Sequence, residues 1–249
     1  MKQHKRLPLA LFLVFALCIQ TLSFTSAAAA LADPEPVFSA SDMTFSSGTD
    51  AVALPQSAVT QLSGLSSGTI IVDFTPTAMS TANCLFSLSN SSVTDAYFNL
   101  YIDNRGFLGL EVRNHGETRY VNLQGPAEVT RNTRHIMALS ADPQEGYKFY
   151  FDGDMVFQMP VALYELWEYD YRFMSTVNSA DVGYMGATYR NGAFGYPYYG
   201  TIDSVRVYDT ALAQDVLEAE TYIEKDSGII RQERSEERRV GKECRSRWS

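Results

Sequence analysis

The protein has 249 residues, of which 45% are hydrophobic and 12% aromatic, and its 20 basic and 29 acidic residues give a net charge of −9. This composition is not biased enough toward Gly, Pro or one sign of charge to indicate disorder, and it can bury a full core. The length suits one large all-β domain or two small ones.

The first 32 residues have the pattern of an export signal. A basic start is followed by a short apolar run over residues 7–18, and then by small residues that end in Ala30, Leu31 and Ala32. The run is too short to span a bilayer. We therefore expect cleavage after Ala32 and a secreted, extracellular protein without membrane insertion. A retained anchor is the alternative.

The last 16 residues, 234–249, differ in composition from the rest and lack apolar periodicity. One interpretation is a basic tail for nucleic acid or an anionic surface. However, the string closely resembles translated sequencing-adapter sequence, so we expect an artefact that belongs to no fold. On this interpretation, residues 223–233 begin a linker to a catalytic domain that the sequence lacks.

Between these ends the chain is strongly acidic. The 3 basic residues of the first segment, and the 6 basic and 3 acidic residues of the last, leave 11 basic and 26 acidic residues for a net charge of −15. Such a surface repels nucleic acid and anionic membranes, so an anionic ligand needs a local cluster of arginines. Cys84 is the single cysteine of this part, which excludes a disulfide or a cysteine-based metal site within it. No cofactor is expected.

Runs rich in β-branched and aromatic residues, separated by turn signals, follow one another along the chain. Short strands at this spacing indicate an antiparallel β-sandwich. One short C-terminal helix is expected where Leu212, Val216, Ala219 and Ile223 recur at helical spacing, and it lacks a good cap residue. The part before residue 67 is rich in Ser, Thr and Ala, with one short turn of helix. The predicted strands are 68–76, 84–90, 96–103, 107–114, 119–124, 135–142, 147–153, 182–190 and 199–209.

The strands 96–103 and 107–114 define a polar face. Three loop residues between them pair Tyr101 with Gly109, Asn99 with Glu111, and Tyr97 with Arg113, whereas a shift by one would mix apolar and polar faces. This register predicts an outer face with a carboxylate and a guanidinium two residues apart, and a depression above Gly109. By itself such a face is better explained as a solvated sheet surface with modest cross-strand pairs.

A second arginine favours a binding site. Arg190 ends the run 182–190, next to a Gly- and Tyr-rich loop that carries Tyr196, Tyr198 and Tyr199 and almost no charge. Such a loop suits a sugar-contacting rim better than a plain connection.

The motifs GTIIVDFTP, YFNLYIDN, GFLGLEVR, GYKFYFDGD, VGYMGATYR and IDSVRVYDTAL, in this order, resemble the sialic-acid-binding lectin domain of bacterial sialidases, carbohydrate-binding module family 40. The resemblance covers roughly residues 37–222, after a short leader 33–36. It implies a concanavalin-like antiparallel β-sandwich, a jelly roll, that precedes the catalytic propeller of a secreted exo-α-sialidase. Sialylated glycans or glycoproteins are then the expected partners, and a monomer is the expected state.

The resemblance also implies the site. The family's E-x-R strand falls on Glu111 and Arg113, and the arginine at the end of its A-T-x-R strand falls on Arg190. The tyrosine six residues later is Tyr196. The other two positions, a loop acid and a strand aromatic, resemble Asp95 and Tyr101.

Catalytic and metal signatures are missing from the sequence. It has no S-x-D-x-G-x-x-W box, no E-x-D-x-x-E strand and no phosphate loop, and we expect His115 and His135 to be structural. The fragment is therefore expected to have no activity of its own. Two alternatives remain: a concanavalin- or laminin-G-like domain that binds another glycan or a protein, and a spacer domain with a purely structural role.

Overall fold

The computed structural model describes residues 34–114, 121–163, 172–177, 179–190 and 192–224. The chain divides into two compact units, Met1–Pro34 and Glu35–Ser249, and the fold below is that of the second. The expected export signal, His115 and the adapter-like tail 234–249 lie outside the described residues.

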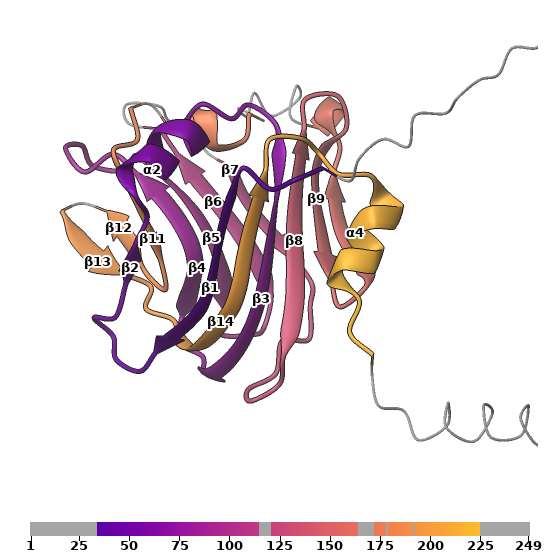
Figure 1. The fold of residues 1–249 in the computed structure, drawn as a ribbon, viewed down its shortest axis with the longest axis horizontal. Coiled ribbons are helices and arrows are strands. Elements are labelled where there is room, and N and C mark those ends of the chain that lie inside the picture. Colours follow the sequence, from indigo (N-terminus) through magenta and orange to yellow (C-terminus); the bar gives the residue numbers. More distant parts are fainter. Residues whose placement is uncertain (1–33, 115–120, 164–171, 178, 191, 225–249) are drawn as a thin grey trace, which may run out of the picture. The chain divides into compact units, whose positions relative to one another are not determined.

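Two six-stranded antiparallel sheets pack face to face (Figure 1). Sheet A has the order β1-β14-β3-β8-β9-β10, and sheet B has the order β2-β11-β4-β5-β6-β7, while β12 and β13 form a separate two-stranded ladder. The strands of sheet A are β1 Phe38–Phe45, β3 Gly68–Ala78, β8 His135–Asp142, β9 Gly146–Phe151, β10 Asp154–Met159 and β14 Tyr199–Tyr208. The strands of sheet B are β2 Val52–Ala53, β4 Ala82–Ser89, β5 Tyr97–Asp103, β6 Leu108–Arg113, β7 Val121–Gly125 and β11 Val182–Met185. The small ladder joins β12 Thr188–Arg190 to β13 Ala193–Gly195.

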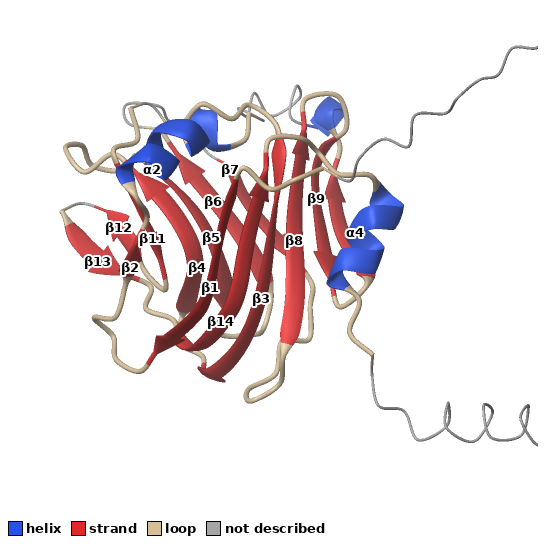
Figure 2. Cartoon of the chain, in the orientation of Figure 1, coloured by secondary structure: helices blue, strands red, loops and turns tan. Residues whose placement is uncertain are grey.

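Helices are few (Figure 2). In the described residues they are α2 Gln56–Leu62, the 3₁₀ turn η1 Met174–Thr176 and α4 Gln214–Thr221 near the C-terminus, and residues 161–163 are also helical. Within the described residues, no helix is long and apolar enough to cross a membrane. The predicted all-β antiparallel sandwich with one short C-terminal helix is therefore confirmed.

The core lies between the sheets and follows from the alternation of side chains along each strand. In β5, Phe98, Leu100 and Ile102 are fully buried among the apolar side chains of both sheets. The β5–β6 register agrees with the prediction, since Tyr97 pairs with Arg113 and Tyr101 with Gly109. It is fixed because a shift of one residue would turn this apolar set away from the core.

Helix α4 covers part of the outer face of sheet A (Figure 1). It buries Leu217 completely, in a small second cluster with Leu212, which precedes the helix, and with Ile71, Ile136, Ala138, Tyr150 and Tyr208. The predicted apolar stripe was wrong in part: Leu212 and Ile223 pack against this cluster, but Val216 and Ala219 are exposed. Leu212 packs from the loop, so the helix begins later and presents Leu217 and Thr221 to the sheet. As predicted, the helix has no side-chain cap.

Two other expectations were wrong. The predicted strand 182–190 is two strands, β11 in sheet B and β12 in the small ladder, with a break at Gly186. Gly186 has φ +82°, and a Cβ there would lie 2.0 Å from Phe45 Cε1, so only glycine fits the turn. The part before residue 67 also contains strand β1, which pairs with β14 and buries Met43 and Phe45.

Candidate functional site

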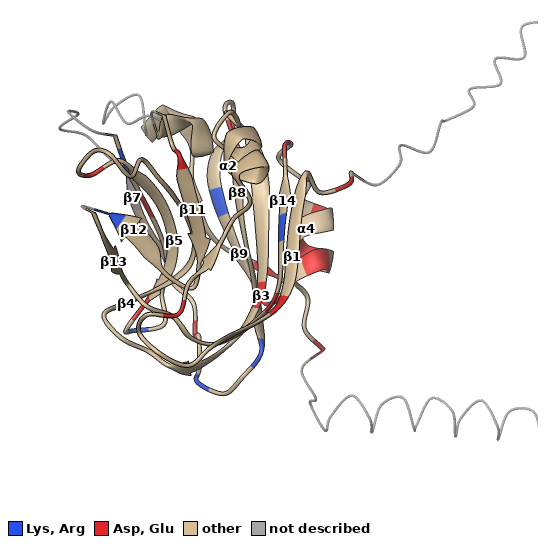
Figure 3. Cartoon of the chain, turned by 60° about the vertical axis from the view of Figure 1, so that its left-hand side comes forward, with Lys and Arg blue, Asp and Glu red and all other residues tan. Residues whose placement is uncertain are grey.

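The polar face predicted for β5 and β6 exists, but it is not an open solvated surface. Tyr97, Asn99, Tyr101 and Glu111 are only 1%, 0%, 7% and 8% exposed. The face is covered because β12 folds back against β4 and β5. In addition, a backbone hydrogen bond from Cys84 N to Tyr196 O, at 2.8 Å, holds the chain after β13 against β4. Figure 3 shows β12 and β13 beside the strands of sheet B, with the basic residue of β12 in blue.

Four side chains on this face form one hydrogen-bonded chain. Arg190 Nη1 donates to Tyr97 Oη at 3.2 Å, and Tyr97 Oη donates to Glu111 Oε1 at 2.8 Å. The same Glu111 oxygen accepts from Arg113 Nε at 3.2 Å. Two arginines that lie far apart in the sequence are thereby fixed on one carboxylate, Arg113 directly and Arg190 through Tyr97.

Aromatic rings flank the Arg190 guanidinium. Its Cζ lies 4.2 Å from the centroid of the Tyr196 ring and 5.6 Å from that of Tyr97, within the range of cation–π attraction. The Tyr196 ring lies 6.3 Å from that of Tyr101. Tyr196 adopts φ +53°, which is costly for a residue with a side chain, and this backbone turn brings its ring over the arginine.

The expected depression above Gly109 is filled. A Cβ at Gly109 would lie 2.3 Å from Tyr101 Cζ, so the Tyr101 ring rests directly on the glycine backbone. The sequence pattern correctly paired these two positions, but it did not predict that the larger side chain would lean over the smaller one.

Asp95 lies just before β5, half-buried, with φ +56°. Its negative charge acts on Arg113. Partial burial lowers the pKa of Arg113, but the hydrogen bond to Glu111 and the electrostatic interactions with Tyr97, Glu111 and Asp95 outweigh this effect and raise it. The pKa of Arg190 is also raised, because the hydrogen bond to Tyr97 and the surrounding acidic groups outweigh burial. Both guanidinium groups therefore carry a full positive charge.

All six residues singled out in the sequence lie around this face. A hydrogen bond, a cation–π contact and a ring contact join Glu111, Arg113, Arg190, Tyr196 and Tyr101, and Asp95 acts on them through its charge. Tyr97 links the two arginines. The sequence analysis placed it on the polar face but did not count it among the site residues, although its position opposite Arg113 could have indicated this role. Tyr198, expected on the rim, is instead fully buried in the core.

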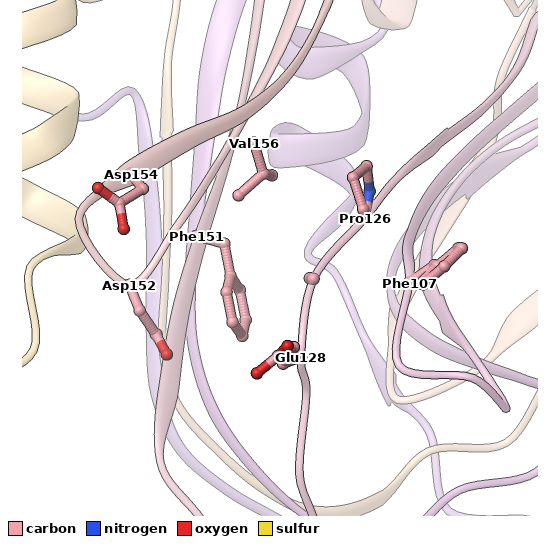
Figure 4. Close-up of a pocket in the computed structure, with 8 residues that line it drawn as sticks. Phe107, Pro126, Glu128, Phe151, Asp152, Asp154 and Val156 are labelled. Atoms are coloured by element: carbon pink, nitrogen blue, oxygen red, sulfur yellow. The ribbon is translucent and has the colours of Figure 1, made fainter.

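A separate pocket of about 420 Å³ opens between the turn that joins β9 to β10 and the segment after β7 (Figure 4). Its described lining combines apolar side chains with the carboxylates of Glu128, Asp152 and Asp154, and contains no basic residue. Asp152 is already bonded to His135, whose Nδ1 lies 2.8 Å from Asp152 Oδ2. Negative charge makes this pocket unsuited to an anionic ligand, unlike the arginine face.

Candidate metal ligands do not gather in the described part of the chain: no group of three or more His, Cys, Asp or Glu side chains could hold an ion. Cys84 is fully buried, and burial raises the pKa of its thiol.

Fold and site together define a class of protein: a β-sandwich module that carries a small arginine- and tyrosine-lined site on the outer face of one sheet. A family described as the sialidase N-terminal domain matches residues 44–225, which is most of the chain. The chain belongs to this family and is a sialidase-associated module of carbohydrate-binding family 40.

Three relatives show the extent of the similarity. The chain is 29% identical over 161 residues to the anhydrosialidase of Macrobdella decora, a match that covers 61% of this chain and 20% of the relative. It is 26% identical over 161 residues to sialidase B of Streptococcus pneumoniae, covering 61% of this chain and 22% of that protein. This chain therefore spans about a fifth of the length of these sialidases.

Among solved structures, the family 40 module of the Ruminococcus gnavus IT-sialidase, bound to α2,3-sialyllactose, superposes with a TM-score of 0.68 at 28% identity. That match covers 76% of this chain and 100% of the module. The concanavalin-like sandwich predicted from the sequence is thus the fold of this protein.

Proposed function

We propose that this module binds the terminal sialic acid of sialylated glycans and glycoproteins, without catalysing a reaction. The observation that carries the proposal is the hydrogen-bonded chain of Arg190, Tyr97, Glu111 and Arg113, which holds two cations on one face of an otherwise acidic protein. Since sialic acid presents a carboxylate, paired guanidinium groups can bind it through charge-assisted hydrogen bonds.

The remaining groups suit the other parts of the sugar. The half-buried Tyr196 and the edge of Tyr101 offer apolar surface to an acetyl methyl group or to ring carbons. Glu111 Oε1 accepts hydrogen bonds from both Tyr97 and Arg113, so Oε2 is the atom that accepts a hydrogen bond from a sugar hydroxyl or an amide N–H. Asp95 adds negative charge beside Arg113 and confines the positive potential to a small area.

Similarity supports the ligand class. The Ruminococcus gnavus module, which this chain matches over that module's whole length, is described with sialyllactose of both α2,3 and α2,6 linkage. A single sugar bound in a small site gives modest affinity, so retention on a glycoprotein is expected to come from tethering and from repeated ligands.

We further propose that the module is the N-terminal part of a secreted bacterial exo-α-sialidase, since both curated relatives are sialidases. In this proposal residues 1–32 are a cleaved signal, 33–36 a leader and 37–222 the module. Residues 223–233 begin a linker, and 234–249 are adapter-like. The module itself, as a monomer, releases no sialic acid from a fluorogenic sialoside; turnover that persists through repurification would contradict the non-catalytic assignment.

Titration calorimetry with sialyllactose and with lactose tests the binding function. Binding of sialyllactose alone is the expected result, because lactose lacks the carboxylate. If neither sugar binds while a glycan array finds another ligand, the module recognises a different glycan. If no glycan or protein partner binds at all, the domain is a spacer.

A further inference from the structure

The two arginines of the site are held in different ways. Arg113 Nε bonds directly to the Glu111 carboxylate at 3.2 Å, an ion pair in which the Arg113 side chain is 35% exposed. For Arg190, no carboxylate within the described residues lies at ion-pair distance. Its partners are the Tyr97 hydroxyl and the faces of the Tyr97 and Tyr196 rings.

The direction of these hydrogen bonds is fixed by chemistry. A guanidinium can only donate and a carboxylate can only accept. The Tyr97 hydroxyl between them must therefore donate a hydrogen bond to Glu111 and accept one from Arg190. Tyr97 is 1% exposed and belongs to β5, a central strand of sheet B, so neither the hydroxyl nor the ring can turn away without disturbing the sheet.

We infer that Tyr97 is a positioning residue for the proposed sialic-acid site: its hydroxyl orients the Arg190 guanidinium for an anionic ligand without neutralising its charge. The inference rests on the proposed function. A carboxylate in the same position would also orient Arg190, but it would compensate the charge that the ligand needs. A phenol that donates a hydrogen bond to Glu111 keeps its proton and remains neutral. The same hydrogen bond polarises its oxygen, which makes that oxygen a better acceptor for Arg190.

The surroundings of the Tyr97 phenol keep it neutral. Burial raises the pKa of Tyr97, and the nearby negative charge of Glu111 raises it further, while Arg190 opposes both effects. The hydroxyl therefore keeps its proton under all conditions in which the protein would meet its ligand.

The test compares the wild type with Tyr97→Phe, which keeps the ring and removes the hydroxyl. Sialyllactose affinity, measured by NMR titration, should fall about 10- to 100-fold, as expected for one hydrogen bond to a charged group. The matched control is Tyr150→Phe, which removes a buried hydroxyl that has no partner within the described residues, on the other sheet. Its affinity should equal that of the wild type.

A second readout follows the Arg190 Nε–Hε group by NMR in the ligand-free protein. Its heteronuclear NOE should be that of an immobile group in the wild type and should drop in Tyr97→Phe, whereas the exposed Arg131 is mobile in both. A purely packing role for Tyr97 would leave this signal unchanged. Because the wild-type comparison of Arg190 with Arg131 needs no mutation, it remains decisive even if Tyr97→Phe folds poorly.

The outcomes separate the two proposals. A wild type that ignores sialyllactose refutes the proposed function, while the Arg190 signal still tests the role of Tyr97. A wild type that binds, with Tyr97→Phe binding equally well, refutes the positioning role and leaves the function intact. An Arg190 group as mobile as Arg131 in the wild type also refutes the positioning role.

Discussion

The ring of Tyr101 rests on the backbone of Gly109 on the neighbouring strand, so closely that a Cβ on residue 109 would lie 2.3 Å from Tyr101 Cζ. The same ring lies beside that of Tyr196, with the two ring centroids 6.3 Å apart. The centroid of the Tyr196 ring in turn lies 4.2 Å from Arg190 Cζ. Gly109, which is not part of the hydrogen-bonded chain, therefore influences the position of this proposed ligand-binding arginine through the two tyrosine rings.

Gly109→Ala should therefore weaken both stability and binding. Overpacking at the Tyr101 ring is expected to cost about 1–3 kcal/mol in the free energy of unfolding. Displacement of Tyr101 and Tyr196 should also lower sialyllactose affinity. Denaturant unfolding and calorimetry measure the two effects.

The matched control for this change is Gly64→Ala, where the new Cβ would meet only the Gln61 carbonyl oxygen at an ordinary 3.5 Å. In a Tyr101→Leu background, Gly109→Ala should cost less, because the clash is relieved. An equal cost in both backgrounds would show that the ring contact is not the cause.

Truncation of either arginine should abolish detectable binding. Arg113→Ala or Arg190→Ala leaves a charged ligand group partly unpaired, which costs about 2–5 kcal/mol. That cost corresponds to a factor of roughly 30 to several thousand in affinity. Arg113→Lys should also bind poorly, since an ammonium lacks the planar fork. The measurement is calorimetry with sialyllactose.

The exposed Arg131, which lies outside the site, provides the control for charge: Arg131→Ala should bind like the wild type. Unimpaired binding by both Arg113→Ala and Arg190→Ala would show that the site is elsewhere.

Asp103 should stabilise the β5–β6 hairpin in a pH-dependent way. Its Oδ1 accepts from Arg105 N at 2.8 Å and Phe107 N at 3.0 Å, and its Oδ2 accepts from the Arg105 guanidinium. Burial acts to raise the pKa of this carboxyl, but the hydrogen bonds outweigh it, so the pKa lies below its ordinary 3.8. A depressed pKa means that the stabilisation is complete above pH 3.8 and is lost as the pH falls below that value.

Asp103→Ala is accordingly expected to cost about 1–3 kcal/mol at pH 7. Its deficit relative to the wild type should shrink as the pH falls below 3.8, because protonation then weakens the wild-type bonds. Asp103→Asn keeps one oxygen for the backbone donors and should lose less. Urea unfolding at pH 7 and pH 3 measures these differences; a deficit independent of pH would contradict the role of the charge.

Asn99 should reduce the stability of the fold. It is fully buried beneath the site, and neither Oδ1 nor Nδ2 has a hydrogen-bond partner within the described residues. Since an unsatisfied buried amide costs about 1–3 kcal/mol, Asn99→Val should be neutral or stabilising, as measured by thermal unfolding.

The matched control is Asn83→Val on the adjacent strand. Asn83 is also fully buried, but its Nδ2 donates to Ile102 O at 2.9 Å and its Oδ1 accepts from Ser80 N at 2.9 Å. That substitution should destabilise the protein. A comparable loss for Asn99→Val would mean that Asn99 makes bonds as strong as those of Asn83.

Local patterns predicted the sandwich and the β5–β6 register because both depend on nearby residues. The three-residue loop and the alternation of Phe98, Leu100 and Ile102 leave one pairing that keeps apolar side chains together. The C-terminal helix was predicted for a similar reason. Its buried face was wrong because Leu212, counted as helical, packs from the preceding loop.

The enclosure of the site could not be read from local patterns. It depends on Gly186, where the chain turns out of sheet B, and on the bond from Cys84 N to Tyr196 O, which joins distant parts of the sequence. Strand β1 was missed because only Met43 and Phe45 of its residues are fully buried, so its apolar signal is weak. The linking role of Tyr97 was not predicted because it depends on the hydrogen bond to Arg190, a residue that is distant in the sequence.

Strand β1 opens the sandwich and β14 is its last strand, yet they are hydrogen-bonded neighbours in sheet A, with Phe38 opposite Val207. Helix α4, which follows β14, lies against β8 and β9 of the same sheet. Both ends of the described domain therefore lie on the side of sheet A, opposite the sheet that carries Glu111 and Arg113, and a neighbouring domain attached on that side would leave the recognition face uncovered.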